Sequence, residues 1–196
     1  MATLRRLPAA ERRDTIVDAG ARSFAARPFE DVRMDEIADG AGVSRALLYR
    51  HFASKSELFT AVYQAAVGRR LTETAAQAAL PLVEQLTSGL DAHLDYFIAN
   101  RNTVLAANRE MSGDPAIKAI IADEFGALRD RLLATVELQQ RPRDAAGALL
   151  MSWLVFVQVL CVEWLSTPTF TRDALRNMCV GALLGALDEL PRKPPS

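Results

Sequence analysis

The chain has 196 residues, half of which are hydrophobic, and its formal net charge is −1. This composition excludes a disordered chain and a protein that coats nucleic acid with a uniformly basic surface, and the length is sufficient to bury a core. The charge is uneven, because residues 1–70 carry 12 Lys and Arg against 9 Asp and Glu, whereas residues 71–196 carry 11 against 15. The asymmetry indicates a front and a back part with different roles.

The sequence carries no signature of an enzyme, a metal site or an exported protein. Motifs of the GxSxG, P-loop and HExxH types are absent, and Cys161 and Cys179 have no CxxC or Cys/His spacing. We therefore predict no catalytic residue, no metal and no cofactor. Because no apolar segment follows Arg5 and Arg6, a secretory signal is not indicated and we expect a cytoplasmic protein.

The apolar residues recur at helical spacing throughout, which predicts an all-α protein. A first helix is expected to open near Pro8 and to end before Pro28. A second helix is expected over about residues 33–41. The fourth helix begins near Ser54, which forms a capping box with Glu57 three residues later.

The turn between the second and third helices has the spacing of a helix-turn-helix. Gly42 can adopt the positive φ that a tight turn requires, and Ser44 can cap the third helix through its hydroxyl group. Ala38, Gly42 and Leu48 supply a small residue at the helix crossing, a glycine at the turn and an aliphatic anchor. The remaining long polar side chains of the third helix are either solvated or the contacts that a DNA major groove requires.

The segment from about residue 12 to residue 63 contains IVDAGARSF at residues 16–24 and DEIADGAGVSRALLYRHFASKSEL at residues 35–58. These motifs resemble the DNA-binding domain of TetR-type transcriptional regulators. The resemblance implies a homodimer that binds a palindromic operator in double-stranded DNA and releases it when a small-molecule effector enters the C-terminal domain. It also implies that the regulator is a repressor.

Side-chain chemistry and the resemblance together point to a set of DNA contacts. Arg45 and Arg50 suit a guanine edge or a phosphate, and Lys55 suits a phosphate at the start of the fourth helix. Leu47 suits a thymine methyl group or plain packing, and His51 suits either a phosphate contact or a cap or packing role below the third helix. The predicted DNA-binding residues are Arg33, Ser44, Arg45, Ala46, Leu47, Tyr49, Arg50, His51 and Lys55.

The resemblance places Tyr49 where the family contacts the DNA backbone through a hydroxyl group. Two positions depart from the family pattern. Pro28 stands where glycine is frequent, and we expect this to change only the turn. Arg33 stands where a threonine frequently caps the second helix and contacts phosphate; an arginine can contact phosphate but cannot cap in the same way.

From residue 71 onward the pattern predicts a larger helical domain with an effector pocket. A helix over about residues 81–101 places His93 on its apolar face, as a packed core residue or a polar anchor in the pocket. Asp114 and Pro115 open a further helix as its cap and first residue. Few charges fall within the apolar faces, which favours a hydrophobic effector. The predicted pocket residues, each of which could equally be core, are His93, Phe97, Met111, Phe125, Trp153, Phe156 and Trp164.

Residues 145–162 form an apolar run close to the length of a membrane span. Gln158, expected opposite the face that carries Trp153, and the following Glu163 favour instead a helix covered from two directions in a core or a subunit interface. A final helix is expected over residues 172–190. We predict no membrane span and a four-helix interface between two copies, an arrangement that the family resemblance also implies. The predicted interface residues are Val157, Leu160, Leu175, Met178, Gly181, Ala182 and Gly185.

These features divide the chain into a helix-turn-helix DNA-binding domain (residues 1–53), a connecting helix (54–80), a ligand-binding and dimerisation domain (81–190) and a disordered tail (191–196). We predict a ligand-responsive transcriptional repressor in which the connecting helix couples effector binding to DNA release. The alternative is a dimeric helical carrier or sensor of a hydrophobic ligand without sequence-specific DNA binding. The salt dependence of DNA binding separates the two.

Overall fold

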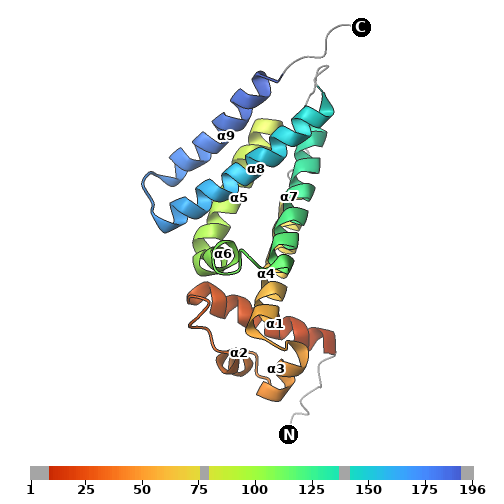
Figure 1. Ribbon diagram of the computed structural model, residues 1–196, viewed down its shortest axis with the longest axis vertical. Helices are drawn as coiled ribbons and strands as arrows, with labels where there is room; N and C mark the ends of the chain where they lie inside the picture. Colours follow the sequence, from red (N-terminus) through yellow and green to blue (C-terminus); the bar gives the residue numbers. More distant parts are fainter. Residues whose placement is uncertain (1–8, 76–79, 137–141, 191–196) are drawn as a thin grey trace. The chain divides into compact units, whose positions relative to one another are not determined.

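The computed structural model describes residues 9–75, 80–136 and 142–190, which form nine α-helices and no strand (Figure 1). The helices are α1 (Ala9–Ala26), α2 (Met34–Gly40), α3 (Arg45–His51), α4 (Lys55–Ala75), α5 (Leu82–Ala99), α6 (Arg101–Asn108), α7 (Pro115–Thr135), α8 (Arg143–Ser166) and α9 (Arg172–Asp188). The predicted all-α class is confirmed. Arg5, Arg6, Pro8 and the predicted tail at residues 191–196 lie outside the described residues.

The chain divides into two compact units. The first comprises residues 1–66 and 100–117, and the second comprises residues 67–99 and 118–196. Helix α4 therefore contributes residues to both units. The sequence-based division ended the DNA-binding domain at residue 53 and gave α6 to the C-terminal domain; as a statement about function it remains a prediction.

The first unit is built around apolar side chains from α1, α2, α3 and the first half of α4. Ile16, Ile37, Leu48 and Phe59 are all 0% exposed. The rings of Phe24 and Phe59 meet edge to face with their centroids 5.1 Å apart. Because helices as short as α2 and α3 are not stable alone, this shared core holds them in place.

Side chains cap the starts of several helices, as the sequence predicted. Ser44 caps α3 by accepting a hydrogen bond from a main-chain N–H in the first turn, at 3.2 Å. Ser54 accepts the N–H of Glu57 at 3.1 Å, and the Glu57 carboxylate accepts the N–H of Ala53 at 2.7 Å. Asp114 caps α7 with bonds of 2.8 and 3.2 Å to two N–H groups. Both the capping box and the cap ahead of Pro115 are confirmed.

Helix α6 was not predicted from the sequence. Its Asn102 donates a hydrogen bond of 3.0 Å to the carbonyl of Ala25, at the end of α1. The last carbonyls of a helix have no partner within it, so this side chain satisfies one of them. The contact joins residues 77 apart in sequence, and no local sequence pattern predicts it.

The second unit packs α8 against both α5 and α9, which Figure 1 shows running side by side with α8. Leu94, Leu150 and Cys179 are at most 1% exposed. The indole N–H of Trp153 donates to the carbonyl of Cys179 at 2.8 Å, which joins α8 to α9. Both cysteines are free and buried.

Helix α8 is the one helix among the described residues whose length and composition would suit a membrane span, with a mean hydropathy of 2.2. Core helices of soluble proteins meet the same criterion. One side of α8 is packed within the second unit, whereas Val155, Phe156 and Val159 on the other side are 47%, 42% and 58% exposed. On α5, Ile98 is also exposed, at 48%.

Candidate functional site

Gly42 forms the turn between α2 and α3. Its φ is +65°, in the left-handed region that glycine adopts without steric cost. The N–H of Gly42 donates to the carbonyl of Asp39, and the N–H of Val43 donates to the carbonyl of Ala38, both at 3.0 Å. These bonds close the end of α2 tightly, so that α3 begins within a few residues at a fixed angle.

Helix α3 has a buried side and an accessible side. Leu48 is 0% exposed and the following Phe52 is 1% exposed, so both anchor the helix in the core. Among the predicted DNA-binding residues, Ser44, Arg45, Ala46, Tyr49 and Arg50 are exposed, and Leu47 and His51 are half-buried. The accessible side thus carries two guanidinium groups and a phenol, the donors that base edges and phosphates accept.

Arg45 is partly engaged within the protein. Its Nη1 lies 3.0 Å from Oδ2 of Asp35, and its guanidinium carbon lies 5.5 Å from the centre of the Tyr49 ring. Because Arg45 and Asp35 are both exposed, their ion pair contributes only about 0–1 kcal/mol. Arg50 forms no ion pair with the described residues. Both arginines can therefore be redirected to DNA at low cost.

Lys55, which was predicted to contact a phosphate, is engaged within the protein. Its ammonium donates to three main-chain carbonyls in the loop between α1 and α2, those of Phe29 at 2.7 Å and of Glu30 and Val32 at 3.1 Å. The nitrogen also lies 4.6 Å from the centre of the Phe29 ring. An ammonium has three N–H donors, so none is left for a phosphate in this conformation. Lys55 instead holds the loop onto the start of α4.

Arg33 and His51 flank the helix-turn-helix. Arg33 precedes α2, is exposed and makes no side-chain cap, as expected from its departure from the family pattern. It remains free to contact a phosphate. The ring centroid of His51 lies 6.5 Å from that of Phe52, a contact that favours the packing role among its two alternatives.

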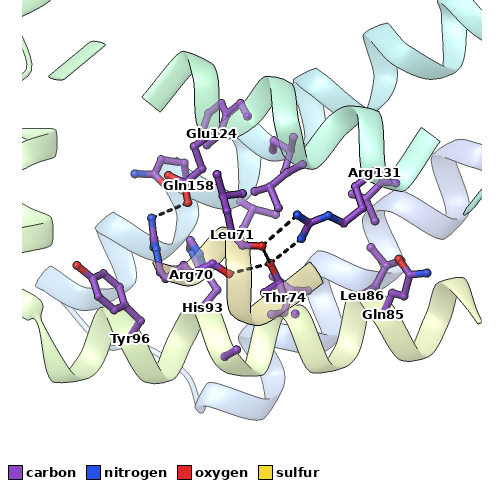
Figure 2. A pocket seen from close by; sticks show the side chains of 18 of the residues that line it. Arg70, Leu71, Thr74, Gln85, Leu86, His93, Tyr96, Glu124, Arg131 and Gln158 are labelled. Carbon is purple, nitrogen blue, oxygen red and sulfur yellow. Dashed lines mark hydrogen bonds and ion pairs between the residues drawn. The ribbon is translucent and has the colours of Figure 1, made fainter. Parts of the chain in front are cut away.

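The second unit contains a cavity of about 160 Å³ lined by α4, α5, α7 and α8 (Figure 2). Much of its wall is aliphatic or aromatic. The larger apolar side chains of this wall include Leu86, Leu90, Phe125, Leu128, Leu154 and Val157.

One end of the cavity is polar and contains a buried ion pair. Nη2 of Arg70 lies 2.5 Å from Oε1 of Glu124, and the two side chains are only 12% and 8% exposed. Burial raises the pKa of the Glu124 carboxyl group, an effect that Arg70 opposes. The guanidinium carbon of Arg70 also lies 4.4 Å from the centre of the Tyr96 ring. Glu124 thus holds one edge of the guanidinium group, and the Tyr96 ring covers one of its faces.

Two further basic side chains lie on the lining. Arg131 donates to Oγ1 of Thr74 at 2.7 Å and to the carbonyl of Leu71 at 3.1 Å, both of which are neutral acceptors. The ring of His93 packs against that of Phe97 at an interplanar angle of 36°, with the ring centroids 3.9 Å apart. Burial lowers the pKa of His93 to about 3, with a further contribution from the charge of Arg70, so the imidazole is neutral at neutral pH.

The predicted pocket residues fall into two groups. His93, Phe125 and Trp153 line the cavity. The others do not: Phe97 is buried beneath His93, Met111 is buried in the first unit, Phe156 is 42% exposed, and Trp164 donates its N–H to the carbonyl of Phe170. Helical spacing identified apolar residues correctly, but it could not tell which side of each helix faces a cavity.

The sequence analysis missed the polar lining. Arg70, Glu124 and Arg131 were not predicted, and Gln158, expected opposite Trp153, lines the same cavity as Trp153. The pairing of Arg70 with Glu124 spans 54 residues, so spacing could not reveal it. The available signal was the position of Glu124 on its helix, since the residues three and four positions away on either side, Ile120, Ile121, Ala127 and Leu128, are all apolar.

The predicted interface residues on α8 and α9 also divide. Leu175 is 0% exposed and Val157 is 5% exposed, so both are packed within the chain and cannot contact a second copy. Leu160 is half-buried, and Met178, Gly181, Ala182 and Gly185 are exposed. The exposed apolar residues of α8, which are Val155, Phe156 and Val159, were not included in the prediction.

The sequence model of a family described as bacterial regulatory proteins, tetR family, matches residues 16–62. The chain is 51% identical over 59 residues to the HTH-type transcriptional activator FasR of Mycolicibacterium smegmatis, a match that covers 30% of this chain and 27% of FasR. It is 29% identical over 181 residues to the HTH-type transcriptional regulator MT0489 of Mycobacterium tuberculosis, covering 84% of this chain and 72% of that protein.

Solved structures share the fold. A tetR-family transcriptional regulator from Streptomyces coelicolor superposes with a TM-score of 0.78 at 23% identity, over 92% of this chain and 83% of that chain. FadR from Bacillus subtilis, solved in complex with stearoyl-CoA, superposes with a TM-score of 0.66 at 15% identity, over 87% and 96%. These relatives and neighbours are transcriptional regulators and not enzymes.

Proposed function

Because the chain belongs to the tetR family of bacterial regulatory proteins, we propose that it is a cytoplasmic, ligand-responsive repressor that binds a palindromic operator as a homodimer. The observation that carries this proposal is the accessible side of α3. It presents Arg45, Tyr49 and Arg50 on a helix fixed by the Gly42 turn and the buried Leu48. A recognition helix, the helix that enters the DNA major groove, needs both a fixed orientation and long side chains that donate hydrogen bonds.

The dimer is proposed to form through α8 and α9. Val155, Phe156 and Val159 on α8 and Met178 on α9 are large apolar side chains that are each more than 40% exposed. Such a patch on a soluble protein marks an interaction surface. On α9, exposed Gly181 and other small residues would let the helices of two copies approach closely.

The effector is proposed to occupy the cavity of the second unit, where the apolar wall suits a hydrophobic compound. The neighbour FadR from Bacillus subtilis, which binds stearoyl-CoA in its crystal structure, is consistent with a lipophilic effector. Helix α4 supplies Arg70 to the cavity lining and Phe59 to the core of the first unit. We therefore propose α4 as the element through which effector binding changes the separation of the two recognition helices.

The test is selection of bound fragments from a random pool of double-stranded DNA by the purified protein. Enrichment of a palindrome is expected. Arg50→Met should weaken binding to that sequence by about tenfold and lower the salt slope by about one. Arg143→Met, which removes an exposed arginine at the start of α8, should change neither.

Failure of folded, dimeric protein to enrich any sequence would favour the carrier reading instead. In that case DNA affinity should also be equal for all sequences. FasR is named as an activator. A reporter gene placed behind the selected sequence therefore decides the sign of regulation, and repression in the absence of effector is expected.

A further inference from the structure

The lining of the cavity in the second unit is partly polar and partly apolar. Arg70, His93, Tyr96 and Glu124 lie together on one side, which we call the polar end, and Gln85, Leu86 and Arg131 lie on the opposite side (Figure 2). Because much of the remaining wall is apolar, a ligand that meets the polar end and fills the cavity must itself be amphipathic. The chemistry of its head group can be read from the donors that the polar end leaves unused.

Arg70 is the group whose donors are incompletely used. A guanidinium has five N–H donors, and Glu124 accepts from Nη2. Nε and Nη1 of Arg70 are buried and have no hydrogen-bond partner among the described residues. Nε2 of His93 is also buried without a partner in the described part of the chain. A buried donor without an acceptor costs about 1–3 kcal/mol, so a ligand that supplies an acceptor gains this energy.

The charges at the lining favour an anionic acceptor. The lining carries two guanidinium groups, those of Arg70 and Arg131, and one buried carboxylate, that of Glu124. Among the described residues Arg131 is bound to neutral oxygens, and the other carboxylate of the lining, Glu73, is exposed to solvent. His93 adds no charge, because burial keeps it neutral. Apart from the solvent-exposed Glu73, the lining therefore carries an excess of one positive charge.

The volume limits the size of the ligand. At about 160 Å³, the cavity is close to the roughly 150 Å³ of an engineered protein cavity that binds benzene. An apolar body of about six to ten carbon atoms is the scale that such a space admits with small adjustments of side chains.

We propose that the effector is a small carboxylic acid with an apolar body, whose carboxylate accepts hydrogen bonds from Arg70 at the polar end. This inference rests on the proposed function, because only that function makes the ligand of this cavity an effector. Glu124 is a positioning residue: it holds one edge of the guanidinium and leaves Nε and Nη1 for the ligand. It also repels a second carboxylate and so weakens binding of the acid.

The experiment compares three probes of equal chain length, which are octanoate, 1-octanol and octylammonium. Binding is followed by the fluorescence of Trp153, which lies on the cavity lining, in a Trp164→Phe background that leaves this indole as the sole tryptophan. Octanoate should bind at least about tenfold more tightly than octanol, because a hydrogen bond to a charged group is worth more than one to a neutral group.

Substitutions at the polar end then test the assignment. Arg70→Met should weaken octanoate binding by about tenfold and weaken octanol binding much less, and Arg70→Lys should recover part of the loss for octanoate. Glu124→Gln should strengthen octanoate binding, a gain that misfolding cannot mimic. Arg129→Met, which removes an arginine of α7 that pairs with Asp130 outside the cavity, is the matched control and should change nothing.

Equal affinities for the three probes, preferential binding of octylammonium, absence of binding by any probe, or an acid preference that survives Arg70→Met would each overturn the proposal. The readout does not involve DNA. If octanoate binds through Arg70 but no operator can be selected, the repressor proposal fails and the ligand assignment stands. If an operator is selected and octanoate does not bind, the ligand assignment fails and the proposal of an operator-binding regulator stands.

Discussion

Lys55 illustrates how a single side chain can satisfy a sequence pattern and still act elsewhere. A lysine in the first turn of a helix is well placed for a phosphate, because the helix N-terminus attracts anions. In the structure its three donors are used by the carbonyls of the loop between α1 and α2. In this conformation its hydrogen bonds stabilise the fold.

We expect Lys55→Met to act mainly on stability. Loss of bonds from a charged donor to three carbonyls, two of them in partly buried contacts, should lower the free energy of unfolding by about 1.5–3 kcal/mol, measured by urea denaturation. Arg50→Met, in contrast, removes an exposed side chain and should leave unfolding unchanged while weakening operator binding. A Lys55→Met protein of normal stability that loses operator affinity would restore the phosphate role.

His93 should make stability depend on pH. The pKa of His93 falls from 6.5 to about 3 on folding, because burial disfavours the charged form. Between these values the unfolded chain binds a proton that the folded chain does not, so stability is complete above pH 6.5 and falls as the pH falls. The residues that act on it are Arg70, which lowers its pKa, and Glu124, which pairs with Arg70.

The loss of stability at low pH can be estimated from the lowered pKa of His93. At about pH 5, protonation of His93 in the unfolded state should cost about 2 kcal/mol of stability relative to neutral pH. His93→Gln should remove that part of the pH dependence. The comparison is the difference in unfolding free energy between about pH 7.5 and about pH 5 for the two proteins. Equal differences would show that His93 is protonated in the folded state.

At the scale of elements, two glycines in helices have opposite surroundings. A Cβ added at Gly20 in α1 would lie 3.1 Å from Cγ2 of Val62 in α4, where the two helices cross. A Cβ added at Gly68 in α4 would meet nothing within 4 Å. A Cβ at the first position therefore requires Val62 to shift by a few tenths of an ångström, whereas no contact opposes a Cβ at the second.

This contrast predicts different responses to the same substitution. Gly68→Ala should stabilise the protein by about 0.5–1 kcal/mol, because alanine has the higher helix propensity. Gly20→Ala gains the same propensity but crowds Val62, so it should be less stable than Gly68→Ala. Thermal unfolding of the two variants tests the order. A Gly20→Ala protein as stable as the Gly68→Ala protein would mean that α1 and α4 separate without cost.

At the scale of the whole molecule, the exposed apolar residues of α8 are the surface on which we propose that the dimer forms. We expect Val159→Asp to dissociate the proposed dimer, because it would bury a charge in an apolar interface. Val83→Asp is the matched control: Val83 on α5 is 50% exposed and Val159 is 58% exposed, but Val83 lies outside α8 and α9. Sedimentation equilibrium measures the dissociation constant. Equal dissociation constants for the Val159→Asp and Val83→Asp variants would show that the exposed surface of α8 is not the dimer interface.

Local patterns predicted the first unit well. Gly42, Ser44 and the Ser54–Glu57 capping box act within a few residues of themselves, so their effect is visible in the sequence. The burial of Leu48 follows from helical spacing for the same reason. Helix α6 was not predicted, because the contact that holds its Asn102 is with Ala25 at the end of α1, which is remote in sequence.

The candidate ligand site was predictable only in part. Helical spacing places Phe125 and Trp153 on apolar faces, and both line the cavity. The same reasoning chose Phe156, which is exposed, and Leu175, which is fully buried within the chain. Spacing shows that residues share a face, but it does not show whether that face meets the core, a cavity or another copy.

By itself, the sequence determined the all-helical class, the helix-turn-helix and the family, because turns, caps and apolar periods depend on residues close together in the chain. Only the tertiary structure decided that Arg70 meets Glu124 inside a cavity, that Lys55 is bound by a distant loop, and which side of α8 remains exposed. Each of these depends on segments that are remote in sequence and adjacent in space. Charge and shape at such sites arise from packing, and packing is not encoded in any one segment.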